Sequence, residues 1–212
     1  APADFFHGLV DEVEYFDRAL SPLQVQSIYE LGSTHQPDTG FGVATIHVGN
    51  TGLGALPTIT DSVIIDGYTQ PGSSPNTNGP GLGDNAVPLI ELDGTDAGSA
   101  NGLWISAGNS TVRGLVINRF SGSGVLLTGS GGDVIEGNFL GTDVTGSVKL
   151  KNGGGVTIVS LNNIIGGTTA AARNVISGND NGVGVAEGSG GNLIEGNFIG
   201  TDATGTEALG NA

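Results

Sequence analysis

The chain contains one sequence motif twice, in almost identical form. Residues 135–146 read IEGNFLGTDVTG, and residues 194–205 read IEGNFIGTDATG. The two copies are 59 residues apart (194 minus 135), and a weaker echo lies between them, IIGG from Ile164 and NVISGN from Asn174. The interval therefore holds two units of about 30 residues each, a period typical of structures built from stacked repeats.

Each unit is made of very short apolar alternations separated by Gly, Asn, Ser, Thr and Asp. With 40 glycines among 212 residues, these stretches disfavour helices. Three short strands joined by Gly/Asn turns describe one rung of a parallel β-helix, in which each strand pairs with the rungs above and below at roughly 4.8 Å. We therefore predict an all-β parallel solenoid.

The alternation also predicts which side chains point inward. We expect two sets of inward columns, first Leu103/Ile105, Val125/Leu127, Val156/Ile158 and Val183/Val185, then Val112, Ile135, Ile165 and Ile194. The residues between them, among them Trp104 and Arg113, should point outward. Asn138, Asn174 and Asn197 fall at the same turn of their rungs, where stacked amides can bond to one another. We interpret these three as an asparagine ladder.

A family resemblance follows from three stretches: ITDSVIIDGYTQPG from Ile59, NSTVRGLVIN from Asn109, and the GNFIGTDATG repeat. Residues 59–212 resemble the right-handed parallel β-helix repeat regions of large secreted bacterial proteins in the pectate-lyase-like superfamily. The resemblance implies a right-handed, single-stranded β-helix and a secreted or cell-surface location. It leaves the activity open, since enzymes, surface proteins and carbohydrate-binding modules share this fold.

The N-terminal part differs in kind. Residues 6–16 alternate like a strand, and Ser21-Pro22-Leu23-Gln24 is a helix start that predicts one α-helix over residues 22–31. The motif GLVDEV from Gly8, with RALS from Arg18, resembles the tail of a LamG-like (concanavalin-like) jelly-roll domain. We predict three regions: a strand-helix segment at 1–33 that could cap the solenoid, a connector at 34–58 with one strand at 44–48, and a β-helix at 59–212.

The charge balance limits the partners. Six Lys and Arg stand against 21 Asp and Glu, a net charge of −15, which argues against nucleic acid as a partner. Neutral polysaccharides, cations and basic surfaces remain open. No apolar run is long enough to insert into a membrane, and there is no cysteine. The chain stops inside a repeat, so we expect a fragment whose uncapped last rung can associate end to end.

Two aspartates suggest paired carboxylates. Asp66-Gly67 and Asp93-Gly94 are 27 residues apart (93 minus 66), one rung length. If they stack, the carboxylates could share Ca²⁺ or perform glycoside chemistry. The alternative is that Asp-Gly is an ordinary turn dipeptide. Asp143 and Asp202 occupy the same place in the repeated TDxTG loop, so they are further calcium candidates, although an aspartate there more often caps its own loop. We expect no other cofactor.

A sugar site is predicted on the first rungs, beside the long polar excursion at 69–88. An outward Trp is a platform for a sugar ring, and Arg can hold a uronate carboxylate. The expected binding residues are Trp104, Arg113, Arg119, Glu91 and Asp93, and the weak catalytic candidates are Asp66, Asp93 and Arg113. The sequence favours a non-catalytic structural or glycan-binding module. The alternative is a polysaccharide lyase or glycoside hydrolase acting on acidic polysaccharide.

Overall fold

The chain divides into two compact units, Ala1–Thr39 and Gly40–Ala212. The computed structural model describes residues 42–49, 52 and 54–212. The strand-helix segment predicted for residues 1–33, including the α-helix at 22–31, lies outside the described residues. Within them no α-helix occurs, only two short 3₁₀ helices, η1 (Gly67–Thr69) and η2 (Ala170–Ala172). Nor does any helix in these ranges have the length and apolar content to cross a membrane.

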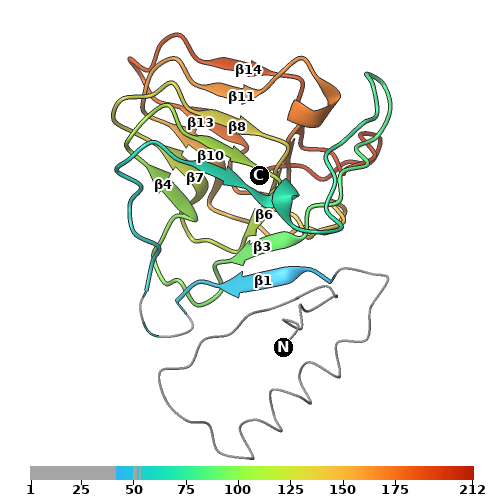
Figure 1. The fold of residues 1–212 in the computed structure, drawn as a ribbon, viewed down its shortest axis with the longest axis horizontal. Coiled ribbons are helices and arrows are strands. Elements are labelled where there is room, and N and C mark those ends of the chain that lie inside the picture. Colours follow the sequence, from blue (N-terminus) through green and yellow to red (C-terminus); the bar gives the residue numbers. More distant parts are fainter. Residues whose placement is uncertain (1–41, 50–51, 53) are drawn as a thin grey trace, which may run out of the picture. The chain divides into compact units, whose positions relative to one another are not determined.

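The described part is built from parallel strands in three sheets (Figure 1). Sheet A contains β1 (Ala44–His47), β3 (Ile90–Asp93), β6 (Leu115–Asn118), β9 (Phe139–Leu140), β12 (Val175–Ile176) and β15 (Phe198–Ile199). Sheet B contains β4 (Leu103–Ile105), β7 (Ser123–Leu127), β10 (Gly154–Ile158) and β13 (Val183–Val185). Sheet C contains β2 (Ile64–Asp66), β5 (Thr111–Arg113), β8 (Val134–Glu136), β11 (Ile164–Gly166) and β14 (Leu193–Glu195).

From β2 onward the chain visits sheets C, A and B in turn, and each strand pairs with the strand three places later. We call one such passage a rung. Strand β1, predicted to be part of a connector, instead joins sheet A and pairs in parallel with β3. An all-β fold with parallel sheets is therefore confirmed.

The predicted inward columns are confirmed in register and, for the inner rungs, in burial. Val125 pairs with Leu103 and Val156, and Ile135 pairs with Val112 and Ile165. These six side chains are buried. The prediction of burial is wrong only for the last members of the columns, Val185 and Ile194, which are exposed. The physical reason is that β13 and β14 have a described neighbour on one side only.

Amide ladders run along all three corners of the stack. The predicted ladder is confirmed, because Asn138 Nδ2 donates to Asn174 Oδ1 at 3.2 Å and Asn174 Nδ2 donates to Asn197 Oδ1 at 2.8 Å. Two further ladders were not predicted. Their members are Asn152, Asn179 and Asn211 between sheets A and B, and Asp133, Asn163 and Asn192 between sheets B and C. Each amide satisfies backbone groups that the turns leave buried.

The outer face of sheet A carries a second apolar cluster. Val116, Phe139 and Val175 are buried there with Ala203, and Phe198 packs against them. The excursion at 69–88 lies against the later rungs, since Asp84 N donates to Ala203 O and Asn76 Nδ2 donates to Ala170 O. Arg173 completes this contact by stacking on the Phe198 ring and donating to Leu82 O. The excursion therefore covers sheet A.

Candidate functional site

The residues predicted to form one sugar site lie on three different sheets. Trp104 is on β4 of sheet B, and Arg113 is on β5 of sheet C. Glu91 and Asp93 are on β3 of sheet A, with Arg119 directly after β6 of the same sheet. Only Glu91, Asp93 and Arg119 come together, and the excursion at 69–88 bonds to later rungs instead. The expected convergence on the first rungs is therefore not found.

Asp66 and Asp93 do not stack. Asp66 ends β2 in sheet C, where its register partner is Arg113, and Asp93 ends β3 in sheet A, where its partners are His47 and Asn118. A spacing of one rung length fails to align them because the chain has moved to the next sheet. The paired-carboxylate geometry that motivated a shared Ca²⁺ or glycoside chemistry is absent from this pair.

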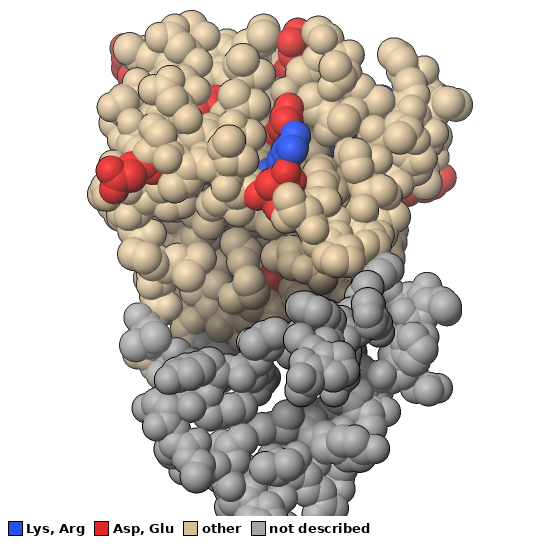
Figure 2. Space-filling model, in the orientation of Figure 1, with Lys and Arg blue, Asp and Glu red and all other residues tan. Residues whose placement is uncertain are grey.

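Asp66 belongs instead to an ion pair on the outer face of sheet C. Arg113 Nη2 donates to Asp66 Oδ2 at 2.6 Å, and Arg113 Nη1 lies 3.8 Å from Glu136 Oε1. The hydrogen bond from Arg113 is the main cause that holds the pKa of Asp66 below its usual value, with a further bond from Tyr68 N. On the face shown in Figure 2, basic atoms adjoin acidic atoms rather than forming a separate basic patch.

Asp93 lies in a denser network at the C-terminal end of strand β3. Burial alone would raise its pKa, but hydrogen bonds from Thr95, together with the charges of Arg119 and His47, hold that pKa below the ordinary value. Thr95 donates to Asp93 Oδ1 from both its backbone N and its hydroxyl, and Arg119 Nη1 donates to Oδ2 at 2.9 Å. Asp93 is therefore an anion with its oxygens occupied.

Glu91 is held by neighbours in the same way. Thr45 Oγ1 donates to its Oε2 and Asn118 Nδ2 to its Oε1, each at 2.8 Å, and Arg119 Nη1 lies 3.5 Å away. All the partners of the Arg119 guanidinium among the described residues are reached through Nη1, which leaves Nη2 and Nε free in this part of the chain. The free edge of a guanidinium can donate two parallel hydrogen bonds.

Arg119 also has an unusual backbone. Its φ is +62°, in the left-handed region that side-chain-bearing residues seldom adopt. Asn152 compensates in part, because its Oδ1 accepts from the next amide, Phe120 N, at 3.0 Å. The amide ladder between sheets A and B therefore supports this corner. Residues with a strained backbone occur often at functional sites, and Arg119 also borders a cavity, so it is a candidate functional residue.

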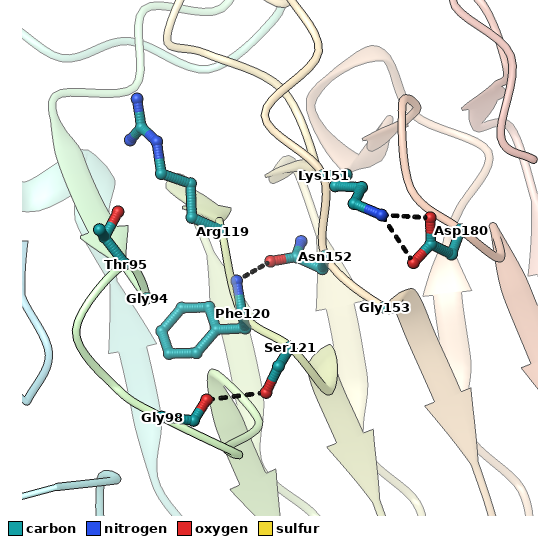
Figure 3. A pocket seen from close by; sticks show the side chains of 10 residues that line it. All are labelled: Gly94, Thr95, Gly98, Arg119, Phe120, Ser121, Lys151, Asn152, Gly153 and Asp180. Atoms are coloured by element: carbon teal, nitrogen blue, oxygen red, sulfur yellow. Dashed lines mark hydrogen bonds and ion pairs between the residues drawn. The ribbon is translucent and has the colours of Figure 1, made fainter.

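The cavity beside Arg119 has a volume of about 380 Å³ and crosses four successive rungs (Figure 3). Arg119 and Thr95 lie on one side and Lys151 and Asp180 on the other, and the ring of Phe120 lies on the Arg119 side, next to Gly94. The rest of the lining consists of Gly94, Gly98, Ser121, Asn152 and Gly153. Lys151 Nζ donates to both Asp180 oxygens, at 2.9 and 3.1 Å. We call this cavity the A–B pocket.

Sequence reasoning reached Arg119 but missed the rest of the A–B pocket. The sheet A strands that precede Lys151 and Asp180 are only two residues long, Phe139–Leu140 in β9 and Val175–Ile176 in β12, so no alternation marks them. One usable signal exists. Asn152-Gly153 and Asn179-Asp180 each fall just before a strand of sheet B, as a second asparagine ladder would require.

Trp104 stands apart from the A–B pocket. Its side chain is 44% exposed on the outer face of sheet B, where its register partner on the next rung is Leu126. The indole Nε1 donates to Thr128 Oγ1 at 2.9 Å, which fixes the ring orientation. A fixed, exposed indole is a surface on which a sugar ring can stack, so Trp104 remains a candidate on its own.

The remaining calcium candidates, Asp143 and Asp202, accept hydrogen bonds from residues of their own loops. Asp143 Oδ1 accepts from Ser147 N and Val148 N, and Asp202 Oδ1 accepts from the Thr204 hydroxyl and Glu207 N. The bond from Thr204 is the main cause that lowers the pKa of Asp202. Among the residues that the structure describes, no three His, Cys, Asp or Glu side chains gather as metal ligands. These aspartates therefore fit a loop-capping role better than a calcium site.

The comparisons with known proteins give no relative. No protein-family model, no curated protein and no solved structure matches this chain.

Proposed function

We propose that this chain is a right-handed parallel β-helix module of a secreted or cell-surface bacterial protein, and that it binds a glycan without performing catalysis. The observation that carries the proposal is the A–B pocket, a polar cavity whose lining comes from four successive rungs. The cyclic order of the sheets and the corner ladders support the β-helix. The handedness and the location rest on the sequence resemblance.

The lining suits a polyhydroxylated ligand. Thr95 and Ser121 offer hydroxyls, Arg119 offers its free edge, and the Lys151–Asp180 pair offers both a donor and an acceptor. Pockets that recognise small polar molecules place a few such groups on a preformed wall, here the turns that carry Gly94, Gly98 and Gly153. Successive rungs repeat at roughly 4.8 Å, close to the length of one pyranose unit in an extended chain. A linear glycan could therefore present one sugar to each rung.

The charges favour a neutral glycan. Arg119 already faces Asp93 and Glu91, and Lys151 faces Asp180, so the pocket has no uncompensated positive charge. The whole chain carries a net charge of −15, which repels a polyanion at long range. Sugar hydroxyls can bond to paired ions without adding charge. We therefore propose a neutral polysaccharide as the ligand.

A polysaccharide lyase or glycoside hydrolase is the second candidate, and the geometry supports it less. The catalytic candidates Asp66 and Arg113 are bonded to each other in sheet C, whereas Asp93 is bonded to Arg119 at sheet A. A reaction at one glycosidic bond needs its acid and base around the same sugar. An assay for unsaturated products or new reducing ends on polygalacturonate tests this candidate directly.

The binding experiment compares gel retardation of the 212-residue chain in neutral glucans, mannans and galactans with retardation in polygalacturonate. The variant is Lys151→Ser with Asp180→Ser, because both side chains are about half exposed or more and their surface pair contributes little stability. We expect about a tenfold loss of affinity, equal to about 1.4 kcal/mol. The matched control is Lys149→Ser, an exposed lysine outside the pocket.

Trp104→Ala separates the two glycan surfaces. If the A–B pocket binds the ligand, this variant retains its affinity and the double variant loses it. The reverse result places the site on sheet B, on the indole. No retardation in any polysaccharide would overturn the proposal of glycan binding.

A further inference from the structure

An aliphatic stripe runs along the outer face of sheet C. Its members are consecutive register partners on the five strands: Ile64, Thr111, Val134, Ile164 and Leu193. Ile64, Ile164 and Leu193 are 76%, 37% and 46% exposed, whereas Thr111 and Val134 between them are partly buried. The alternation along a strand explains why they point outward, since their neighbours Ile65, Val112, Ile135, Ile165 and Ile194 form the inward column. We call this row the sheet C stripe.

A charged row lies beside the stripe, two residues further along each strand. It consists of Asp66, Arg113, Glu136, Gly166 and Glu195. Three acids and one arginine give this row a net charge of −2 (1 minus 3). The outer face of sheet C therefore combines a mainly aliphatic row with an acidic row, and exposed aliphatic side chains gathered on one face mark interaction sites.

A second copy of the chain does not fit this face. Two such faces packed with parallel strands would bring one acidic row against the other, and two packed with antiparallel strands would leave both acidic rows without basic partners, which is unfavourable. The stripe is also narrow: it is one residue wide and five strands long, roughly 19 Å at 4.8 Å per strand. A strip of this width suits a slender partner that also reaches the acidic row, rather than the broad face of a second folded chain. A slender, basic partner fits better than a broad acidic one.

We propose that the sheet C stripe docks an amphipathic α-helix of a partner protein, with aliphatic side chains along one face and Lys or Arg along the flank. The spacing of residues along the stripe matches the repeat of side chains on a helix better than the repeat on a strand. Side chains on one helix face recur every turn, about 5.4 Å, close to the strand spacing of about 4.8 Å. Same-face side chains of a strand recur at about 6.8 Å and lose register with the stripe. The partner helix needs about 13 residues to span the stripe.

The basic flank follows from the acidic row. Lys or Arg side chains on that flank face Asp66, Glu136 and Glu195, of which Glu195 has no ion pair among the described residues. Charge complementarity of this kind sets the partner and its direction more than the affinity. This inference is independent of glycan binding, which concerns other faces of the molecule.

The first test asks whether the stripe is open in the 212-residue chain. Because the chain has no cysteine, Ile164→Cys creates a unique probe. We expect the thiol to react with a maleimide about as fast as in the denatured chain. A rate more than about tenfold slower would show that the chain itself or a second copy covers the stripe, and this would overturn the proposal.

The second test measures binding of three synthetic helical peptides by fluorescence anisotropy. One carries a Leu row with a Lys flank, one a Leu row with a Glu flank, and one an Ala row with a Lys flank. We expect only the first to bind, and to weaken as salt increases. Equal binding of the Lys-flank and Glu-flank peptides, or binding of none, would overturn the proposal.

Variants of the chain complete the test. Ile164→Asn should weaken the Lys-flank peptide about tenfold, and Glu195→Gln should reduce the salt dependence. Val148→Asn is the control, because Val148 is an exposed aliphatic residue on the loop closed by the Thr142–Lys149 bridge, outside sheet C. If Val148→Asn weakens binding as much as Ile164→Asn does, the peptide contacts exposed apolar side chains in general and the assignment to sheet C fails.

Discussion

At the scale of single residues, the corners of the stack depend on amides that form hydrogen bonds in two directions. Asn174 receives Asn138 N and Nδ2 on its Oδ1 and donates its Nδ2 to Ile135 O and Asn197 Oδ1. It has no exposed surface. Two glycines are needed beside these ladders. Gly141 and Gly166 have φ of +90° and +87°, and amides of the ladders occupy the space that a Cβ would need.

Asn174→Ala should therefore lower the free energy of unfolding by about 1 to 3 kcal/mol, because it leaves buried donors and acceptors on two neighbouring rungs unpaired. Urea denaturation measures the effect. Asn181→Ala is the control, since Asn181 is exposed and makes only one long hydrogen bond. A midpoint for Asn174→Ala equal to that of the control would show that the ladder contributes no stability.

Asp133 is the one acid in a ladder position. It is fully buried, its Oδ1 accepts from Ser110 N, and its Oδ2 has no hydrogen-bond partner among the residues that the structure describes. In the other ladders an Asn Nδ2 occupies this place and donates to the next Oδ1, which here belongs to Asn163. Burial raises the pKa of Asp133. The folded chain therefore favours the neutral acid, whose proton can take the place of the amide donor.

Asp133→Asn should stabilise the fold by about 1 to 3 kcal/mol near neutral pH, because it supplies the missing donor. The sign follows from linkage: the unfolded aspartate ionises above about pH 4, whereas the folded one stays protonated to higher pH, so wild-type stability falls as pH rises through this window. Thermal melts between pH 3 and pH 8 should show the advantage growing with pH. Asp96→Asn, at an exposed position, should show no such trend.

At the scale of elements, the sequence revealed two of the three sheets. Sheets B and C have strands of three to five residues with a clear inward and outward alternation, so their columns were predicted in the correct register. Sheet A was missed because β9, β12 and β15 have two residues each and because its outer side chains are also apolar. Because the excursion at 69–88 packs on the outer face of these strands, both of their faces are apolar, and the sequence shows no alternation of apolar and polar residues.

This failure explains why the candidate site was only partly predicted. Without sheet A, the residues after Glu91 and Asp93 could not be assigned to a corner, and Asp66 seemed to lie directly below Asp93. Arg119 was included for its charge, whereas Lys151 and Asp180 could be found only by knowing that four corners align. The local alternation of residues predicts where a strand lies. Which corner residues lie above one another depends on the number of residues in each corner, and this number varies from rung to rung.

A pair of substitutions in β10 tests the register of sheet B. Ile158→Ala should cost about 2 to 4 kcal/mol through the cavity it leaves in the core, because Ile158 is fully buried. Thr157→Ala should cost about 0.5 to 1 kcal/mol, for the lost hydrogen bond between its hydroxyl and that of Ser123. Guanidinium denaturation of both variants is the measurement, and equal losses would contradict the inward position of Ile158.

At the scale of the whole molecule, the faces of the stack offer different chemistry. The A–B corner carries a polar pocket, sheet B an exposed indole, and sheet C an aliphatic row beside an acidic one. The last strands differ again. Their inward residues Val185, Ile194 and Ile199 are 48%, 39% and 46% exposed, whereas Ile158, Ile165 and Ile176 one rung earlier have no exposed surface.

These side chains lie at the edges of β13, β14 and β15, which have no further partner among the described strands, and together they make a surface that should stack on another molecule. We expect the 212-residue chain to self-associate in sedimentation velocity as its concentration increases. Ile194→Lys should abolish this, because it buries a charge in any stacked interface. Leu193→Lys is the control: Leu193 is the adjacent residue but points outward in the sheet C stripe, so association should persist. If Leu193→Lys abolishes association and Ile194→Lys does not, the contact forms through sheet C rather than end to end.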